Sequence, residues 1–201
     1  MITISRQFGT GGHEIGAELA RRLGVKLLDK QILNEVASRM RTVEDAVEKI
    51  ESRNPLWRDD FTNFYRTYMA DAQYDGQEQG ETSHTLFQAQ CDAIRKIAAE
   101  ESCVIVGRCG FDIFADHSNA LKIFIHSSVD CRKRRIAEKY DISEHDAAAM
   151  IVDNDYSREL YTKKFTGRDW KDATNYDISL DVRKFGVNGA ADFLMRVIGD
   201  E

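Results

Sequence analysis

The fold is decided by the stretch Met1-Ile-Thr-Ile-Ser-Arg-Gln-Phe-Gly-Thr-Gly-Gly-His-Glu-Ile-Gly16. A short apolar run ends at a glycine-rich turn, and apolar residues then recur at helical spacing at Ile15, Leu19 and Leu23 before Gly24. A strand, a glycine-rich turn and a helix start, in this order, aim backbone N–H groups and the positive end of a helix dipole at one anion. The stretch therefore predicts a phosphate-binding loop.

This loop departs from the regular phosphate-loop pattern G-x-x-x-x-G-K-[ST], which supplies a lysine and a hydroxyl. When Gly9-Thr10-Gly11 is set on the last glycines of that pattern, Gly12 stands at the lysine position and His13 at the hydroxyl position. Arg6 then replaces the first glycine. Because a glycine-rich turn between a strand and a helix also arises by chance, the interpretation depends on the rest of the chain.

Composition bounds the class of protein. The 201 residues, with 42% hydrophobic content, suffice for one sizeable core and predict one domain with an insertion. A net charge of −6 argues against a nucleic-acid or membrane-surface binder, which needs a basic face. No apolar run approaches the ~20 residues of a membrane span, and the strand pattern from residue 2 leaves no room for a signal peptide. The four cysteines show no zinc-binding spacing. We expect a reduced, cytoplasmic protein whose oligomeric state is open.

Strand-like and helix-like segments alternate along the chain. Apolar runs predict strands at 1–5, 25–28, 103–106, 121–125 and 176–180. Amphipathic stretches predict helices at 13–23, 30–39, 85–100, 129–140, 143–165 and 188–198. This alternation predicts an α/β fold with a parallel sheet and right-handed crossovers. Residues from about 53 to 84 are polar and aromatic without a clear period, and we interpret them as an inserted helical or loop excursion.

Two arginine-bearing motifs follow predicted strands. The third strand ends in Gly107-Arg108, at the carboxyl edge of the sheet, where ligands bind in open α/β folds. The flanking glycines favour a ligand role for Arg108 over a sheet-edge cap in water. The helix after the fourth strand carries Arg132 and Arg135 three residues apart on one face, so both could reach the same phosphate.

Polar residues also recur at helical spacing between 143 and 165. Asp155, Arg158 and Tyr161 lie along one stripe, and this mixture of groups suits a polar ligand. An exposed helix with an i,i+3 pair explains Asp155 and Arg158 equally well, so both interpretations stay open. Asp29, directly after the second strand, is interpreted first as a helix N-cap and second as a ligand group.

Together these motifs resemble the cytidylate-kinase-like family, a branch of the P-loop nucleoside monophosphate kinases. The resemblance spans essentially the whole chain, and its motifs are specific as a set. They are Ser5-Arg-Gln-Phe-Gly-Thr-Gly-Gly-His-Glu-Ile-Gly16, Leu28-Asp-Lys30, Val104-Ile-Val-Gly-Arg108, the run Asp155…Arg158…Tyr161…Trp170, and the closing Asn175-Tyr-Asp-Ile178 strand with its last helix.

The resemblance implies a three-layer, P-loop NTPase-type α/β fold, with a five-stranded parallel sheet and helices on both faces. It implies a core at 1–39, 85–142 and 172–201, a substrate-binding insert at about 40–84 and a lid at about 143–171. The implied activity is phosphoryl transfer from a nucleoside triphosphate, ATP with Mg²⁺, to a small-molecule acceptor. The expected acceptor is a nucleoside monophosphate such as CMP, and no nucleic-acid or membrane partner is expected.

The resemblance also carries roles over to individual positions. The residues expected at the donor phosphates are Gly9, Thr10, Gly11, Gly12 and Arg132. Those expected at the acceptor are Asp29, Arg108 and Asp155. The expected catalytic cations are Arg158 from the lid, and Arg6 and His13 as substitutes for the missing lysine. No residue is assigned as a metal ligand.

The chain departs from the family pattern at Gly12, His13 and Val106, which stand where a lysine, a hydroxyl and an aspartate are usual. It departs again at Ile151 and Asn154, where arginines are usual. Phosphoryl transfer is mostly positioning and charge neutralisation, and one electrostatic contact is worth ~3 kcal/mol. Two function classes therefore stay open. One is an active small-molecule kinase, which the persistence of Arg108, Asp155 and Arg158 favours; the other is a nucleotide-binding sensor or regulator of the same fold without turnover.

Overall fold

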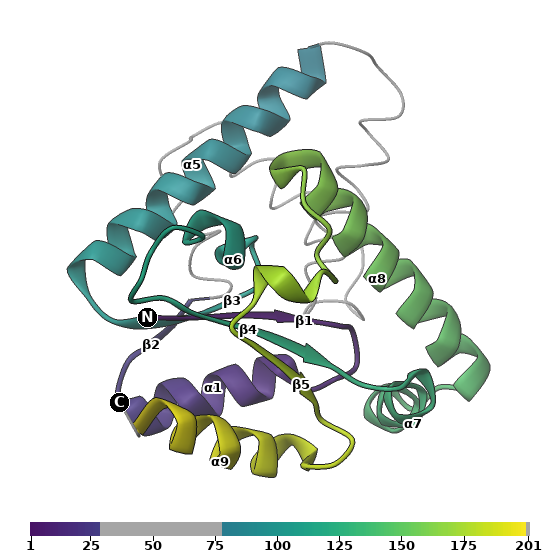
Figure 1. Ribbon diagram of the computed structural model, residues 1–201. Coiled ribbons are helices and arrows are strands. Elements are labelled where there is room, and N and C mark those ends of the chain that lie inside the picture. The colour runs from purple at the N-terminus through teal and green to yellow at the C-terminus, as the bar shows by residue number, and fades with distance from the viewer. Residues whose placement is uncertain (29–77, 200–201) are drawn as a thin grey trace.

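The computed structural model describes residues 1–28 and 78–199 (Figure 1). Within them, five strands form one sheet in the order β2-β3-β1-β4-β5, and every strand is parallel to its neighbours. The strands are β1 (Ile2–Arg6), β2 (Lys26–Leu28), β3 (Cys103–Val106), β4 (Leu121–His126) and β5 (Ile178–Asp181). The predicted α/β class and the five-stranded parallel sheet are confirmed.

The central position of β1 explains its apolar sequence. Ile4 of β1 lies beside Val106 of β3 on one side and Ile123 of β4 on the other. Both faces of β1 are covered, so its residues from Ile2 to Ser5 are all buried. Because all strands are parallel, the segments that follow β1, β3 and β4 leave the sheet at the same edge.

Helices cover both faces of this sheet (Figure 1). Helices α1 (Gly12–Leu23) and α9 (Gly186–Gly199) lie on one face, and α5 (Glu78–Glu100) and α6 (Gly110–Ile113) lie on the other. Helices α7 (Val129–Tyr140) and α8 (Glu144–Thr166) stand at the carboxyl edge, and a short 3-10 helix, η2 (Ala173–Asn175), precedes β5. The arrangement has three layers, with the helix pair α7–α8 over the edge where the loops meet.

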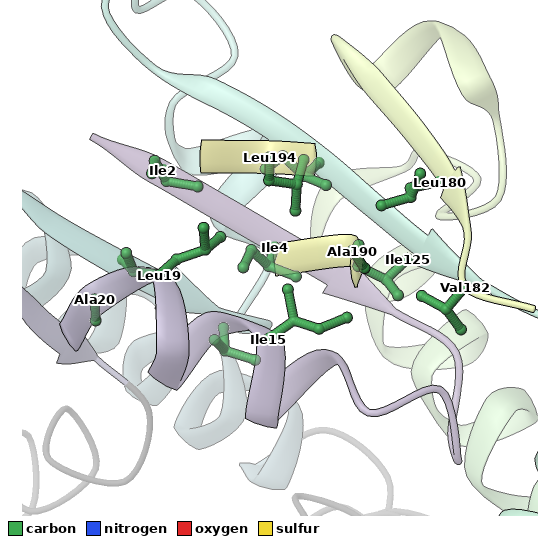
Figure 2. Close-up of a cluster of buried hydrophobic side chains, with 13 residues drawn as sticks. Ile2, Ile4, Ile15, Leu19, Ala20, Ile125, Leu180, Val182, Ala190 and Leu194 are labelled. Atoms are coloured by element: carbon green, nitrogen blue, oxygen red, sulfur yellow. The ribbon is translucent and has the colours of Figure 1, made fainter. Parts of the chain in front are cut away.

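The layer of α1 and α9 fixes the start of α1 against the sheet (Figure 2). Ile15 and Leu19 of α1, four residues apart, point with Leu194 of α9 onto the sheet residues Ile2 and Ile4. Burying each of these side chains contributes about 1.5–3 kcal/mol. The core therefore holds the N-terminal turn of α1, and with it the preceding loop, in a defined position.

Two predicted segments meet the structure differently. Helix α5 begins at Glu78, earlier than the predicted start at residue 85. The residues Gln79 to Ser83 include no apolar side chain, so no period marked this part of the helix. The predicted helix at 30–39 and most of the predicted insert at about 40–84 lie outside the described residues, so they stay predictions.

None of the helices in the described ranges combines the length and apolarity needed to span a membrane.

Candidate functional site

The glycine-rich loop between β1 and α1 has the backbone of an anion-binding turn. Gly9 and Gly11 have φ of 81° and 80°, in the left-handed region that glycine adopts without a Cβ penalty. Gly11 is the N-cap of α1, and no side chain caps it. The N–H groups of the first turn of a helix have no partner inside the helix, and the helix dipole makes this end positive. The loop can therefore hold a phosphate with its backbone, and binding at Gly9 to Gly12 stays a prediction.

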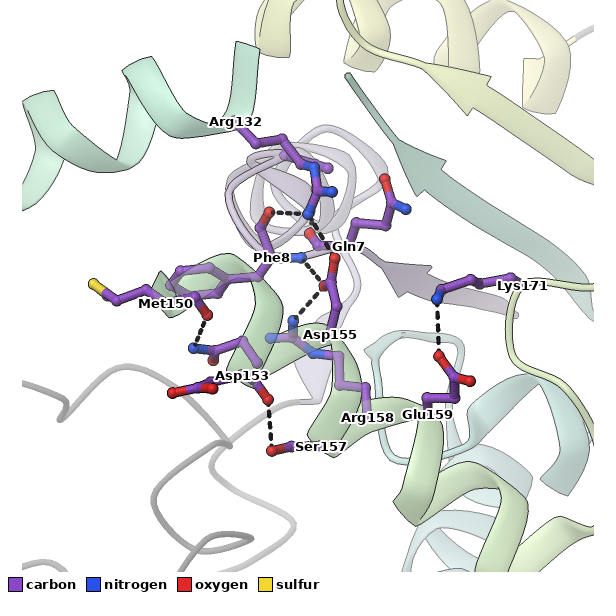
Figure 3. A network of polar contacts seen from close by, with 12 residues as sticks. Gln7, Phe8, Arg132, Met150, Asp153, Asp155, Ser157, Arg158, Glu159 and Lys171 are labelled. Atoms are coloured by element: carbon purple, nitrogen blue, oxygen red, sulfur yellow. Dashed lines mark hydrogen bonds and ion pairs between the residues drawn. The ribbon is translucent and has the colours of Figure 1, made fainter. Parts of the chain in front are cut away.

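The loop is tied to α7 and α8 through Phe8 (Figure 3). The Phe8 N–H donates to Oδ1 of Asp155 at 2.8 Å. Nη1 of Arg132 donates to Oδ2 of Asp155 at 2.6 Å and to the Phe8 carbonyl oxygen at 3.0 Å. The Phe8 ring packs with Ile136 and Ile151 from the two helices. One residue of the loop thus joins both helices by its backbone and its side chain.

Two residues assigned to different ligands meet at this point. Arg132 was expected at the donor phosphates and Asp155 at the acceptor, but the two side chains form a buried ion pair with each other. Sequence spacing could not reveal the pair, because the partners come from different helices. Asp155 also lies 3.5 Å from Nη1 of Arg158, which was the expected i,i+3 pair. Both ligand roles stay predictions, and in this structure the pair positions the loop.

The second arginine of α7 lies against the glycine loop. A Cβ added to Gly11 would stand 3.0 Å from Nη2 of Arg135. Arg135 also donates to Oε1 of Glu14 at 3.0 Å. Although partial burial opposes it, the Glu14 backbone N–H and the charges of Lys139 and Arg135 hold the pKa of Glu14 below its ordinary value. The sequence already indicates that Arg135 shares a helix face with Arg132 and could reach the same phosphate, although only Arg132 is assigned to the donor phosphates.

The turn after β3 has an unusual backbone. Gly107, Arg108 and Cys109 all have positive φ, of 81°, 57° and 54°. A non-glycine residue in this region costs about 1–2 kcal/mol, so the conformation persists only where the surroundings enforce it. It turns the chain from β3 into α6 and leaves Arg108 buried, with 6% of its surface exposed.

Three arginines line a small cavity of about 30 Å³ beside this turn. They are Arg6 from the end of β1, Arg108 from the turn and Arg158 from α8. Tyr161, Trp170 and other described residues complete the lining, and none of the described lining residues is acidic. A cavity of this size has room for one or two water-sized groups. Together with its arginine lining, this space suits oxygen atoms of a small anionic group.

Asp155 partly offsets the charge of Arg158, whereas two further groups at the cavity, Cys109 and Tyr161, are neutral. Burial raises the pKa of the Cys109 thiol to about 12 and also raises the pKa of the Tyr161 hydroxyl above its ordinary value. Both groups are therefore uncharged at neutral pH. The cavity combines the predicted residues Arg6, Arg108 and Arg158, which come from three distant parts of the chain.

Of the two remaining predicted site residues, the structure describes one. His13 lies in the first turn of α1 with an exposed side chain. Asp29 lies outside the described residues. In the described part of the chain, no three acidic, histidine or cysteine side chains come together as a metal-binding group.

A five-stranded parallel sheet in this order, with a glycine-rich loop from its central strand into a helix, defines the fold of the P-loop kinases. The crystal structure of shikimate kinase from Bacteroides thetaiotaomicron has this fold, with 13% identity, coverage of 98% of this chain and 97% of that chain, and a TM-score of 0.52. An uncharacterized protein from Eubacterium ventriosum is similar at 28% identity, with 100% of this chain and 98% of that chain covered and a TM-score of 0.71.

The chain belongs to the cytidylate kinase-like family, whose sequence profile matches residues 1–184. No curated protein matches the chain significantly in sequence. Family and fold together support a nucleotide kinase in general terms.

Proposed function

We propose that this protein transfers the γ-phosphoryl group of a nucleoside triphosphate, ATP, to a nucleoside monophosphate such as CMP. The observation that carries the proposal is that the glycine loop and the three-arginine cavity lie at the same edge of the sheet. Arg6 and Gly107 connect them, because the Arg6 side chain starts at the loop and lines the cavity beside Gly107.

The loop would bind the donor. Its glycines at positive φ and the N-terminus of α1 offer backbone N–H groups to a phosphate chain. Arg135, whose guanidinium borders Gly11, adds a partly exposed positive charge at the same place. Such a site contacts the phosphates of the donor and not its base. It therefore supports a triphosphate donor, and other residues would recognise the base.

The cavity would bind the phosphate of the acceptor. Three guanidinium groups line it, and Asp155 lies beside that of Arg158. A phosphate monoester carries between about −1.5 and −2 charges at pH 7, and its oxygens accept planar, two-point hydrogen bonds from guanidinium groups. A doubly charged phosphate therefore matches three arginines better than a neutral hydroxyl or a single carboxylate does.

The reaction proposed is an in-line displacement at the γ-phosphorus. An oxygen of the acceptor phosphate forms the new bond to the γ-phosphorus while the bond to the β–γ bridging oxygen breaks, and a nucleoside diphosphate leaves with the electron pair. Arg158 on α8 would face the transferred group, and packing of α8 over the edge would exclude water. Phosphoryl transfer of this kind rests on positioning and charge neutralisation more than on covalent chemistry.

We propose that Mg²⁺ accompanies the donor triphosphate, although the described residues do not form a magnesium site of their own. Glu14 and Asp155, which flank the loop, are each bound to an arginine. Mg²⁺ in proteins commonly keeps several waters and binds substrate phosphates through few protein ligands. The phosphate oxygens and water would supply its ligands here.

The test is a panel assay with direct product detection. The protein is mixed with ATP, Mg²⁺ or Mn²⁺, and one nucleoside monophosphate at a time, and the nucleoside diphosphates are followed by ³¹P NMR. We expect ADP and the acceptor diphosphate in equal amounts, most rapidly with CMP.

Arg158→Ala is the matched control for this assay. It should lower kcat on the order of 10³-fold, as for a transition-state arginine. Arg158→Lys should restore only part of the lost kcat, since an ammonium makes no planar two-point contact. Binding of ATP without turnover for every acceptor would contradict the proposal and support the sensor instead.

A further inference from the structure

The side chain of Arg6 fills the space that a side chain on residue 12 would need. Arg6 ends β1 and Gly12 begins α1, so the two residues lie at the two ends of the phosphate loop. A Cβ added to Gly12 would stand 2.7 Å from Cβ and 2.8 Å from Cγ of Arg6, whereas carbon atoms in contact lie about 3.5–4.0 Å apart. Both atoms belong to the base of the side chain, which cannot swing aside. A lysine at position 12 is therefore incompatible with the observed Arg6.

The other end of the Arg6 side chain lies against a second glycine. A Cβ added to Gly107 would overlap Nη1 of Arg6 and lie 3.4 Å from its Cζ. Gly107 begins the left-handed turn after β3, and Arg108 follows it. Arg6 therefore extends from the phosphate loop to the three-arginine cavity, with one glycine beside its base and another beside its guanidinium.

We propose that Arg6 is the catalytic cation of this loop. It stands at the position of the first glycine of the regular phosphate-loop pattern and takes over the role of the lysine in that pattern. Gly12 and Gly107 leave the space that its side chain crosses. This inference rests on the proposed function, because it assigns a role in the same reaction. It also explains why two departures from the regular loop pattern occur together: an arginine at position 6 demands a glycine at position 12.

The Arg6 guanidinium lies beside Gly107 and lines the acceptor cavity, and the base of its side chain adjoins the phosphate loop. As the bond from the γ-phosphorus to the bridging oxygen breaks and the bond to the acceptor oxygen forms, the electron pair stays on the bridging oxygen. The guanidinium neutralises charge on the transferring phosphoryl group and gives up no proton, since arginine stays protonated in proteins. Preorganised charge at this point stabilises the transition state more than the ground state.

The first experiment separates charge from packing. Arg6→Gln keeps most of the side-chain stem and removes the charge. We expect kcat to fall on the order of 10²–10³-fold, with smaller changes in KM for ATP and for the acceptor, and with an unchanged midpoint of urea unfolding. Arg6→Lys should retain part of the turnover. A wild-type kcat in Arg6→Gln, or a loss explained wholly by unfolding, would overturn the inference.

The second experiment rebuilds the regular loop. Gly12→Lys alone should inactivate the enzyme, because its Cβ meets Arg6. The double variant Arg6→Gly with Gly12→Lys should recover at least tenfold in kcat over Arg6→Gly alone. The matched control is Arg6→Gly with Gly12→Ala, which fits the same space without a charge and should recover nothing. If the lysine and alanine double variants have equal kcat, a lysine at position 12 does not replace the charge of Arg6, and the inference is wrong.

The third experiment displaces the Arg6 guanidinium without touching Arg6. Gly107→Ala places a methyl group on it and should lower kcat as Arg6→Gln does. Gly186→Ala is the matched control, because Gly186 also has positive φ (64°) but no atom within 4 Å of an added Cβ. Full activity of Gly107→Ala would contradict the inference.

Failure of the inference differs from failure of the proposed function. A wild-type protein that shows no turnover with any acceptor overturns the proposed function itself. A wild-type protein that turns over together with an equally active Arg6→Gln variant overturns only the role of Arg6.

Discussion

Two glycine-containing turns stand side by side at the carboxyl edge of the sheet, and they use positive φ in opposite ways. In the loop after β1, the left-handed residues are Gly9 and Gly11. In the turn after β3, Arg108 and Cys109 join Gly107 in that region. The first turn needs glycine because a Cβ on Gly9 or Gly11 would meet side chains of α7 or Val187 of α9. The second turn orients the Arg108 side chain, and this conformation costs about 1–2 kcal/mol of backbone strain per non-glycine residue.

The prediction with the largest expected effect tests whether the turn after β3 stays closed to solvent. Burial holds the pKa of Cys109 at about 12, so almost none of its thiol is ionised at pH 8. Alkylation by iodoacetamide should be on the order of 10³-fold slower than for a free thiol of pKa about 8.5. Mass spectrometry of labelled peptides gives the rate, and the partly exposed Cys131 serves as the internal reference. Labelling of Cys109 at the rate of Cys131 would mean that the strained turn opens readily.

The second prediction tests whether the first turn acts through its backbone. A Cβ on Gly11 would meet Cγ2 of Val187 at 2.6 Å and the guanidinium of Arg135 at 3.0 Å. Gly11→Ala should therefore distort the loop and weaken ATP binding at least 100-fold, which corresponds to about 2.7 kcal/mol. Isothermal titration calorimetry measures the affinity.

The control for Gly11→Ala is Gly24→Ala at the other end of α1. Gly24 has a φ of 66° and no atom within 4 Å of an added Cβ, so it carries the same backbone penalty without an obstruction. It should bind ATP as the wild type does. Equal affinities in the two variants would remove the loop from the binding site.

The smallest expected effect measures the strain of the second turn directly. Arg108→Gly and Arg108→Ala both remove the guanidinium, so both should weaken acceptor binding alike. Only glycine adopts φ of 57° without strain, so Arg108→Gly should be more stable than Arg108→Ala by about 1 kcal/mol. Urea unfolding measures the difference. The same pair at the exposed Asp141, with φ of 53°, should differ equally in stability and leave turnover unchanged. An alanine variant as stable as the glycine variant would show that position 108 carries no strain.

The fold could be predicted from the sequence because its signals are local. Apolar runs such as Cys103–Val106, and the spacing of Ile15, Leu19 and Leu23, mark strands and helices without knowledge of their neighbours. The glycines of the first turn were informative for the same reason. The left-handed conformation of Arg108 and Cys109 gave no such signal, because neither residue type prefers it.

The site could be predicted only as a set of residues. Arg6, Arg108 and Arg158 were each identified, but their convergence on one cavity depends on the order of the strands and on the position of α8. The pairing of Arg132 with Asp155 and the passage of Arg6 beside Gly12 are contacts between distant segments. Periodicity and spacing carry no information about such contacts.

The hydrogen bond from the Phe8 N–H to Asp155 makes one backbone amide a reporter for the position of α8. Its acceptor lies on α8, whereas the neighbouring Gln7 N–H donates to the carbonyl oxygen of Ile125 inside the sheet region. When α8 moves away from the loop, the Phe8 amide loses its acceptor and exchanges with solvent deuterium, while the Gln7 amide stays protected until the sheet opens. The ratio of these two adjacent exchange rates reads the opening of α8 separately from the unfolding of the whole protein.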